Sequence, residues 1–233
     1  AMMGLAVLAL LGLAALLGLV LTQSLDAFDP GTVRLSDKLL APLSEATTLV
    51  AAEQRPIADT YWLGTDEFGR DVLSRMLQGS FVSLSIGLIA IGIAVAVGVT
   101  VGAVAGYAGQ VRILGLTVDS ILMRLTDAML CFPTFFLILT VVALLPASIY
   151  NIMIVIGLTS WMGTARFVRA EVLSLKQRDF VVAAVAAGLS EARIVVAHVL
   201  PNAMAPVLVT ATIGIATAIL TESALSFLGF GVQ

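Results

Sequence analysis

The sequence predicts an all-α membrane protein, a polytopic transmembrane helical bundle. Of its 233 residues, 60% are hydrophobic and only 12% are charged. A soluble domain carries roughly 25% charged residues, so too few charged side chains remain here to cover a water-facing surface. In addition, five long runs are mostly apolar, and each is close to the roughly 20 residues that a membrane helix needs.

We therefore expect five membrane spans in this chain. The first covers residues 2–22, carries no charge and is longer than the apolar core of about 7–15 residues in a signal peptide, so it is interpreted as a retained anchor. The other expected spans are residues 81–107, 121–145, 149–167 and 203–228. Pro133 lies inside the third span, and Pro206 lies in the first turn of the fifth, where proline is tolerated. A sixth span beyond Gln233 is also expected.

These spans predict a division of the chain into three parts. Residues 1–22 form the N-terminal transmembrane anchor helix, residues 23–79 form an extracytoplasmic loop, and residues 80–233 form the core domain. The loop ends in LGTDEFGRDVLSRM, residues 63–76, which predicts a turn followed by a short amphipathic helix. Asp66 is of a residue type that caps helices, and we expect it to cap this one.

The distribution of positive charge predicts the orientation. Residues 23–75 hold five Lys/Arg and nine Asp/Glu, whereas residues 166–202 hold five Lys/Arg and three Asp/Glu. Cytoplasmic loops carry the excess of Lys and Arg. We therefore expect the acidic 23–79 loop to be extracytoplasmic, and the N-terminus and the 166–202 loop to be cytoplasmic.

Small residues recur every four positions along the second expected span. This spacing puts them on one stripe of a helix, where they allow close helix contact. The stripe consists of Ala90, Ala94, Gly98, Gly102 and Gly106. Packing alone explains such a stripe, and its partner helix could belong to this chain or to another.

Glu222, Arg124 and Asp127 are ionisable residues within the expected spans. Glu222 lies deep in the fifth span, where a carboxyl group needs a partner or water. It is interpreted either as a path or gate residue or as a hydrogen-bonded structural acid. Arg124 and Asp127 are three residues apart at the start of the third span, and this spacing would allow them to pair.

The segment over residues 166–202 is polar and favours helix. Gly188, with Ser190 after it, predicts a sharp turn, and Ser190 would cap a second helix that begins at Glu191. One reading is a helix, a turn and a helix that project into the cytoplasm. The other is an amphipathic connector that lies on the membrane surface.

Motifs of common enzymes are missing from the sequence. It contains no HExxH, no GxSxG and no GxxxxGK[ST] phosphate-binding loop, so ATP hydrolysis would have to come from another chain. Cys131 and His198 are the only cysteine and histidine, which is too few for a zinc site. Cys131 is expected to be a small core residue. The net charge of −3 provides no basic field for nucleic acid.

The stretch VAAVAAGLSEARIVVAHVLPN, residues 182–202, resembles the cytoplasmic loop of ABC-importer permeases. That loop has a Glu-Ala-Ala pattern, a glycine four residues later and a Leu-Pro-like end. The matching residues are Ala183, Ala184, Gly188, Leu200 and Pro201. Val182 stands where the family often has glutamate, which leaves the helix and turn intact but removes a charge.

Four further motifs resemble the dipeptide/oligopeptide/nickel permease family, and its C-type subunit most of all. They are LGTDEFGRDVLSRM (63–76), MRLTDAMLCFP (123–133), GLTSWMGTARFVRAEVLSLKQRDFV (157–181) and ILTESALSFLGFG (219–231). They occur in the family's order, and the resemblance covers nearly everything from Trp62 onward. It implies the type I ABC importer permease fold, with residues 80–233 as the permease core domain.

The resemblance also implies a function and partners. The chain would form half of the translocation path of an ATP-driven importer for di- or oligopeptides in the bacterial inner membrane. Its partners would be a second homologous permease subunit, an extracytoplasmic solute-binding protein and two cytoplasmic ABC ATPase subunits, which would bind ATP and Mg. No cofactor is expected in this chain. The implied ATPase-coupling residues are Ala183, Ala184, Ala187, Gly188, Leu189, Ser190, Glu191, Ile194, Leu200 and Pro201.

Two other functions remain open on the sequence. One is a permease of the same family for nickel or another small solute. The other is an ATP-independent secondary transporter, which would need intramembrane charges for ion coupling. Only Glu222, and marginally Arg124 and Asp127, could serve that purpose.

Overall fold

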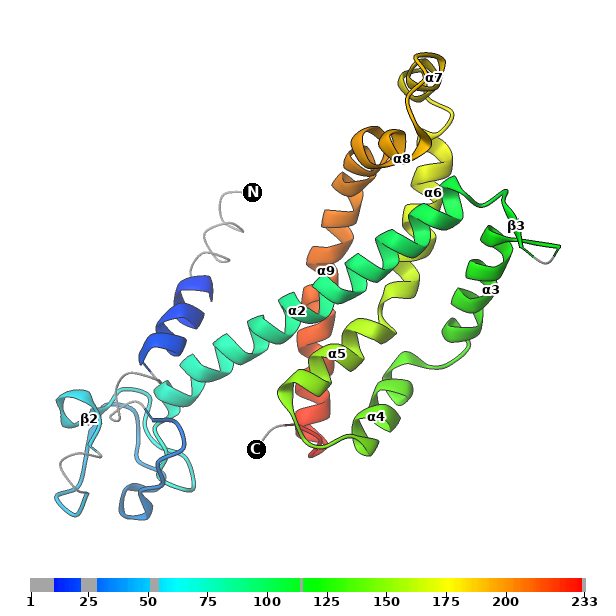
Figure 1. Ribbon diagram of the computed structural model, residues 1–233. Coiled ribbons are helices and arrows are strands. Elements are labelled where there is room, and N and C mark those ends of the chain that lie inside the picture. The colour runs from blue at the N-terminus through cyan, green and yellow to red at the C-terminus, as the bar shows by residue number, and fades with distance from the viewer. Residues whose placement is uncertain (1–10, 22–28, 51–54, 114, 232–233) are drawn as a thin grey trace. The chain divides into compact units, whose positions relative to one another are not determined.

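The computed structural model describes residues 11–21, 29–50, 55–113 and 115–231, and the chain divides into two compact units, Ala1–Ser85 and Ile86–Gln233. Three of the described helices are long and apolar enough to cross a membrane, and a bent helix pair could form a fourth span. The first expected span lies partly outside the described residues, and its described part includes the apolar helix Leu11–Leu21. The predicted all-α membrane fold is confirmed (Figure 1).

The first unit contains a small fold built from short elements. They are the 3-10 helix Leu35–Asp37, strand β1 (Ser44–Glu45), the 3-10 helix Ile57–Asp59, strand β2 (Thr60–Tyr61) and the start of helix α2 (Val72–Tyr107). The two strands pair antiparallel, with Ser44 opposite Tyr61.

A buried carboxylate lies at the centre of this small fold. Asp37 accepts hydrogen bonds from the Tyr61 hydroxyl at 2.8 Å, from the backbone N–H of Thr47 at 3.3 Å and from the Thr47 hydroxyl. Burial alone would raise the pKa of Asp37, but these hydrogen bonds outweigh it and hold the pKa below its ordinary value of 3.8. Burial, together with the bond to Asp37, raises the pKa of Tyr61.

Helix α2 begins differently from the prediction. Asp71, not Asp66, caps it, because the Asp71 carboxylate accepts from the backbone N–H groups of Leu73 and Ser74, both at 3.2 Å. Asp66 instead closes the preceding turn and accepts from the backbone N–H of Arg70 at 3.0 Å. The predicted short amphipathic helix is the first part of the continuous α2, so the expected boundary at residue 79 falls inside a helix.

The second unit is a helical bundle that starts with the later part of α2. A short hairpin of β3 (Arg112–Ile113) and β4 (Leu116–Thr117) leads into the remaining helices. These are α3 (Val118–Leu130), α4 (Thr134–Leu144), α5 (Ile149–Thr159), α6 (Trp161–Leu175), α7 (Asp179–Ala186), α8 (Glu191–Ile194) and α9 (Leu200–Phe227). In Figure 1, α7 and α8 lie at the end of the bundle where α6 ends and α9 begins.

The third expected span is not one straight helix. Helices α3 and α4 meet at 81°, and Pro133 is the residue before α4. Proline has no backbone N–H and clashes with the preceding turn, so the helix breaks there. Cys131, at the end of α3, is exposed, and its prediction as a core residue is wrong.

The fourth and fifth expected spans are longer than predicted. The fourth consists of α5 and α6, which are separated only by Ser160 in a non-helical conformation, and it extends to Leu175. The fifth begins at Glu191 and passes through a π-helical turn, Val195–Val199, into α9. Pro206 consequently lies inside the fifth span rather than in its first turn.

The stripe of small residues on α2 lies against α5 and α6 of the same chain. An added Cβ at Gly102 would lie only 2.5 Å from the carbonyl oxygen of Ala165 in α6, and one at Gly98 would lie 2.6 Å from the Cβ of Thr164. Ala90 and Ala94 are buried in the same contact zone. Close approach of backbones at small residues is the packing that membrane helices use.

Candidate functional site

The turn after α7 requires a left-handed backbone conformation at Gly188. Its φ is +75°, which glycine adopts without a steric penalty. The N–H of Gly188 bonds to the carbonyl of Val185 at 2.9 Å, and the N–H of Leu189 bonds to the carbonyl of Ala184 at 3.2 Å. This pair of bonds is the Schellman arrangement that ends a helix sharply, and it fixes the direction of the chain towards α8.

The loop has a buried side and an exposed side. Val181, Ala184 and Ile194 pack into one apolar cluster with Val168 and Val172 of α6. Leu189 and Leu200 pack against the same cluster. The loop is therefore fixed to α6 and to the beginning of α9 as a single packed body.

The opposite side of the loop presents the remaining predicted coupling residues. Those that the structure places at the surface are Ala183, Ala187, Gly188, Ser190, Glu191 and Pro201. Ser190 precedes α8 as expected, but its side chain makes no capping hydrogen bond. Val182 and Val185 are also exposed, at 57% and 58%, and sequence reasoning did not single out Val185.

A lysine ties the base of the loop to the end of α2. Lys176 donates from Nζ to the backbone carbonyl of Tyr107 at 2.7 Å and lies 4.6 Å from the centre of the Tyr107 ring. A cation at a helix C-terminus stabilises the unpaired carbonyl groups there. The loop is thereby connected to α2 as well as to α6 and α9.

Two ion pairs join α3 to α6. Arg169 binds Asp119 with both ends of its guanidinium group, at 2.5 Å from Nε and 2.6 Å from Nη2. Arg166 binds Asp127, so the predicted pairing of Asp127 with Arg124 is wrong. The two residues of each ion pair are far apart in the sequence. Arg166 and Arg169 are three residues apart on one face of α6, and Asp119 and Asp127 are eight residues apart on one face of α3.

Glu222 has a local partner. Ser226, one turn later in α9, donates a hydrogen bond from its hydroxyl to Glu222 at 2.7 Å. Among the residues that the structure describes, no cation forms a salt bridge with Glu222. This environment favours the structural reading of Glu222 that the sequence left open.

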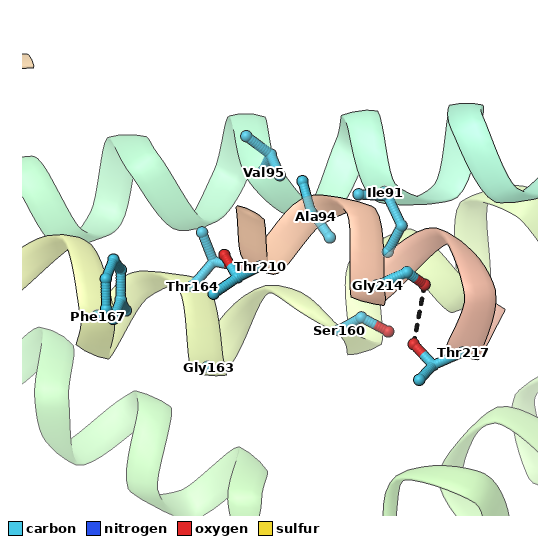
Figure 2. Close-up of a pocket in the computed structure, with 11 residues that line it drawn as sticks. Ile91, Ala94, Val95, Ser160, Gly163, Thr164, Phe167, Thr210, Gly214 and Thr217 are labelled. Carbon is cyan, nitrogen blue, oxygen red and sulfur yellow. Dashed lines mark hydrogen bonds between the residues drawn. The ribbon is translucent and has the colours of Figure 1, made fainter. Parts of the chain in front are cut away.

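A cavity of about 380 Å³ lies between α2, α6 and α9 (Figure 2). Its walls combine apolar side chains such as Ile91 and Phe167 with hydroxyl groups and glycines. The polar and glycine positions are Ser160, Gly163, Thr164, Thr210, Gly214 and Thr217. Sequence reasoning assigned none of them a binding role, although Ser160, Gly163 and Thr164 lie within the quoted motif 157–181.

Within the described parts of the chain, no group of three or more His, Cys, Asp or Glu side chains could hold a metal ion. The packed loop and the cavity are two features that could serve a function.

Comparisons with known proteins agree with this architecture. Residues 98–233, more than half of the chain, match the family described as "Binding-protein-dependent transport system inner membrane component". The chain is 41% identical over 180 residues to the dipeptide transport system permease protein DppC of Alkalihalophilus pseudofirmus, which covers 77% of this chain and 57% of that protein.

Two further relatives are permease proteins for oligopeptides. The oligopeptide transport system permease protein OppC of Bacillus subtilis is 37% identical over 80% of this chain and 59% of its own length. OppC of Haemophilus influenzae is 39% identical over 74% of this chain and 54% of its own length. The chain thus spans a little more than half the length of these relatives. The family match and these identities show that the chain belongs to the inner-membrane components of binding-protein-dependent transport systems, as its motifs predicted.

Proposed function

We propose that this chain is a permease subunit of an ATP-driven importer and forms half of a path for di- or oligopeptides. The relatives' names, which specify dipeptide and oligopeptide transport, support the peptide cargo. The observation that carries the proposal is the loop. It is a helix, a sharp turn and a helix, packed firmly to α6 and α9 and exposed on its other side.

The proposed partners follow from the packed and exposed sides of the loop and from the family. Two cytoplasmic ABC ATPase subunits carry the ATP and Mg and bind the loops of the two permeases, and in this chain the exposed side of the loop is the binding surface. A second homologous permease completes the path, and an extracytoplasmic solute-binding protein delivers the cargo. The excess of Lys and Arg in residues 166–202 supports a cytoplasmic loop, and the acidic 23–79 segment supports an extracytoplasmic position for that segment.

The mechanism is a transfer of motion through a rigid contact. When the ATPase subunits close on ATP, they move the loop. The buried side of the loop, Val181, Ala184 and Ile194, has no space in which to slide over α6 and therefore carries α6 and α9 with it. Alternating access results when these helices change position relative to the second permease.

A glycine substitution tests the coupling. Gly188→Val places a β-branched residue at φ +75°, where an added Cβ meets no atom within 4 Å, so the effect is backbone strain and not a clash. We expect loss of ATPase copurification, or ATP hydrolysis without uptake. Gly188→Asn is the matched control, because asparagine tolerates this conformation. Normal assembly and normal uptake in Gly188→Val would contradict the proposed role of the loop.

An uptake assay separates the alternative functions. Uptake into proteoliposomes should require both ATP and the ATPase subunits, and it should be saturable by a dipeptide or tripeptide. Uptake without ATP would indicate a secondary transporter, and ATP-dependent uptake of nickel but not of peptide would indicate another cargo.

A further inference from the structure

The position of the cavity within the helices is its first informative feature. It lies beside residues 91–95 of α2, Ser160–Phe167 of the α5–α6 span and Thr210–Thr217 of α9. Each of these segments falls near the middle of a helix run that is long and apolar enough to cross a membrane, Val72–Tyr107, Ile149–Leu175 and Glu191–Phe227. The cavity therefore lies along the middle parts of three helix runs that could each cross a membrane.

The second feature is a pair of hydroxyl groups without partners. In α9, Thr210 and Thr217 donate to the carbonyls of Val207 and Gly214, each at 2.8 Å (Figure 2 shows the second). Ser160 and Thr164, in contrast, make no side-chain hydrogen bond with any residue that the structure describes. An unpaired hydroxyl in contact with lipid tails is unfavourable, so these two positions favour an occupant with a hydrogen-bonding group.

The third feature is the break in the span at Ser160. Its backbone conformation, φ −116° and ψ 1°, interrupts the helix between α5 and α6. Non-helical backbone at membrane depth occurs where it is buried in protein or lines a water-filled cavity. Ser160 lines this cavity. The break and the unpaired hydroxyls thus lie on the wall of the same cavity.

The chemistry of the walls limits what can bind. The hydroxyl protons of Thr210 and Thr217 are already donated to backbone carbonyls, so their Oγ1 atoms can only accept a further hydrogen bond. The hydroxyls of Ser160 and Thr164 can both donate and accept. Ile91 and Phe167 supply apolar surface, and no ionised side chain lines the cavity. The charged termini of a peptide would be unpaired here, but an amide group with an adjacent apolar side chain would fit the walls.

We infer that this cavity is the part of the solute path that this chain contributes, and that it holds an uncharged section of a peptide, one amide group together with a neighbouring apolar side chain. The inference rests on the proposed function. The cavity volume of about 380 Å³ is at the lower end of the range for small-molecule sites, roughly 300–1,000 Å³, so the cavity would hold only part of an oligopeptide.

Cysteine accessibility tests the inference. The parent is the assembled transporter with Cys131→Ser, which removes the only cysteine of this chain. Gly163→Cys places a thiol in the cavity wall, and Gly92→Cys is the matched control. An added Cβ meets no atom within 4 Å at either glycine, and Gly92 does not line the cavity.

We expect a positively charged methanethiosulfonate reagent to label Gly163→Cys in proteoliposomes and to abolish uptake of radiolabelled alanine tripeptide. Saturating unlabelled tripeptide should slow this labelling, whereas labelling of Gly92→Cys should be unaffected by the peptide. A labelling rate that is the same with and without peptide would overturn the inference. So would failure of the reagent to reach Gly163→Cys in a transporter with normal uptake, since lipid or a helix of the second permease would then fill the cavity.

A second pair of variants tests the hydroxyl itself. Thr164→Val keeps the shape and removes the hydrogen-bonding group, and the KM for tripeptide uptake should rise about two- to tenfold, as for the loss of one neutral hydrogen bond. Thr212→Val is the control, because Thr212 donates to the carbonyl of Val209 and lies outside the cavity. An unchanged KM in Thr164→Val would overturn the assignment of that hydroxyl. If the Cys131→Ser parent itself takes up no peptide, the proposed function fails, a result distinct from those above.

Discussion

At the scale of single residues, the contact between Arg169 and Asp119 is the most specific polar interaction between helices in the second unit. Two hydrogen bonds at 2.5 and 2.6 Å hold the planar guanidinium against the carboxylate, and both side chains are less than one third exposed. Such bidentate, charge-assisted bonds are stronger than neutral ones. They fix α3 to the same helix that anchors the loop.

Removing one charge of this pair should destabilise the protein. We expect Asp119→Asn to lower the free energy of unfolding by about 1–3 kcal/mol, because it weakens hydrogen bonds to a charged group and leaves Arg169 without a counter-charge. Asp127→Asn in the exposed Arg166 pair is the control, with an expected loss of less than about 1 kcal/mol. Thermal denaturation of the purified protein measures both. Equal losses would show that the geometry of the pair carries no special stability.

Asp37 gives the first unit a dependence on pH. Its pKa is lower in the folded state than its ordinary value of 3.8, so the unfolded chain binds the proton more tightly. The stabilisation is therefore complete above pH 3.8 and is lost as the pH falls through the folded-state pKa.

Hydrogen exchange should show this loss directly. Protection of the amides in β2, corrected for the intrinsic rate, should fall as the pH is lowered below about 4, and Asp37→Asn should remove most of the pH dependence. Thr47→Val, which deletes one of the donors to Asp37, should give an intermediate result. Protection that stays constant through this range in the unsubstituted protein would contradict the assigned role of Asp37.

At the scale of elements, glycine and the other small residues were the reliable signals in the sequence. Gly188 predicted the turn after α7, and the small-residue stripe predicted a close helix contact without identifying α6 as its partner. The break at Ser160 had no comparable signal, because serine interrupts a helix only in particular surroundings. The π-helical turn Val195–Val199 joins α8 to α9, and Ile194 and Val199 are buried in the loop's apolar cluster. No residue pattern in the sequence indicates this turn.

Pro133 shows the limit of such signals. It lies inside the third expected span, yet its presence does not specify the 81° bend between α3 and α4. Likewise, Asp66 and Asp71 are both suitable caps by residue type, and only the backbone path decides which of them begins α2.

The contact between α2 and α6 can be tested at Gly102. An added Cβ would lie 2.5 Å from a backbone carbonyl oxygen, which cannot move without shifting α6. We expect Gly102→Ala to lower stability by about 1–3 kcal/mol through overpacking. Gly92→Ala has open space around the added Cβ and should be neutral or slightly stabilising. The melting temperatures of the two variants decide this, and similar values would argue against a tight α2–α6 contact.

At the scale of the whole molecule, the second unit combines a packed loop at one end with a cavity between three helices that are long and apolar enough to cross a membrane. Helices α6 and α9 contribute to both, since they hold the buried side of the loop and also line the cavity. Force applied at the loop therefore acts on the helices that surround the cavity. The motifs in the sequence predicted the family and the loop, but the cavity could not be predicted, because its walls come from three helices whose packing one sequence does not specify.

Crosslinking from Val185 tests the central claim most directly. In the Cys131→Ser parent, Val185→Cys places a thiol on the exposed side of the loop, where Val185 is 58% exposed. We predict that a short bifunctional reagent will join it to an ATPase subunit from the cytoplasmic side, and that the crosslink will stop uptake. A loop thiol that is labelled from the extracytoplasmic side, or that never captures an ATPase subunit in a working transporter, would contradict the account.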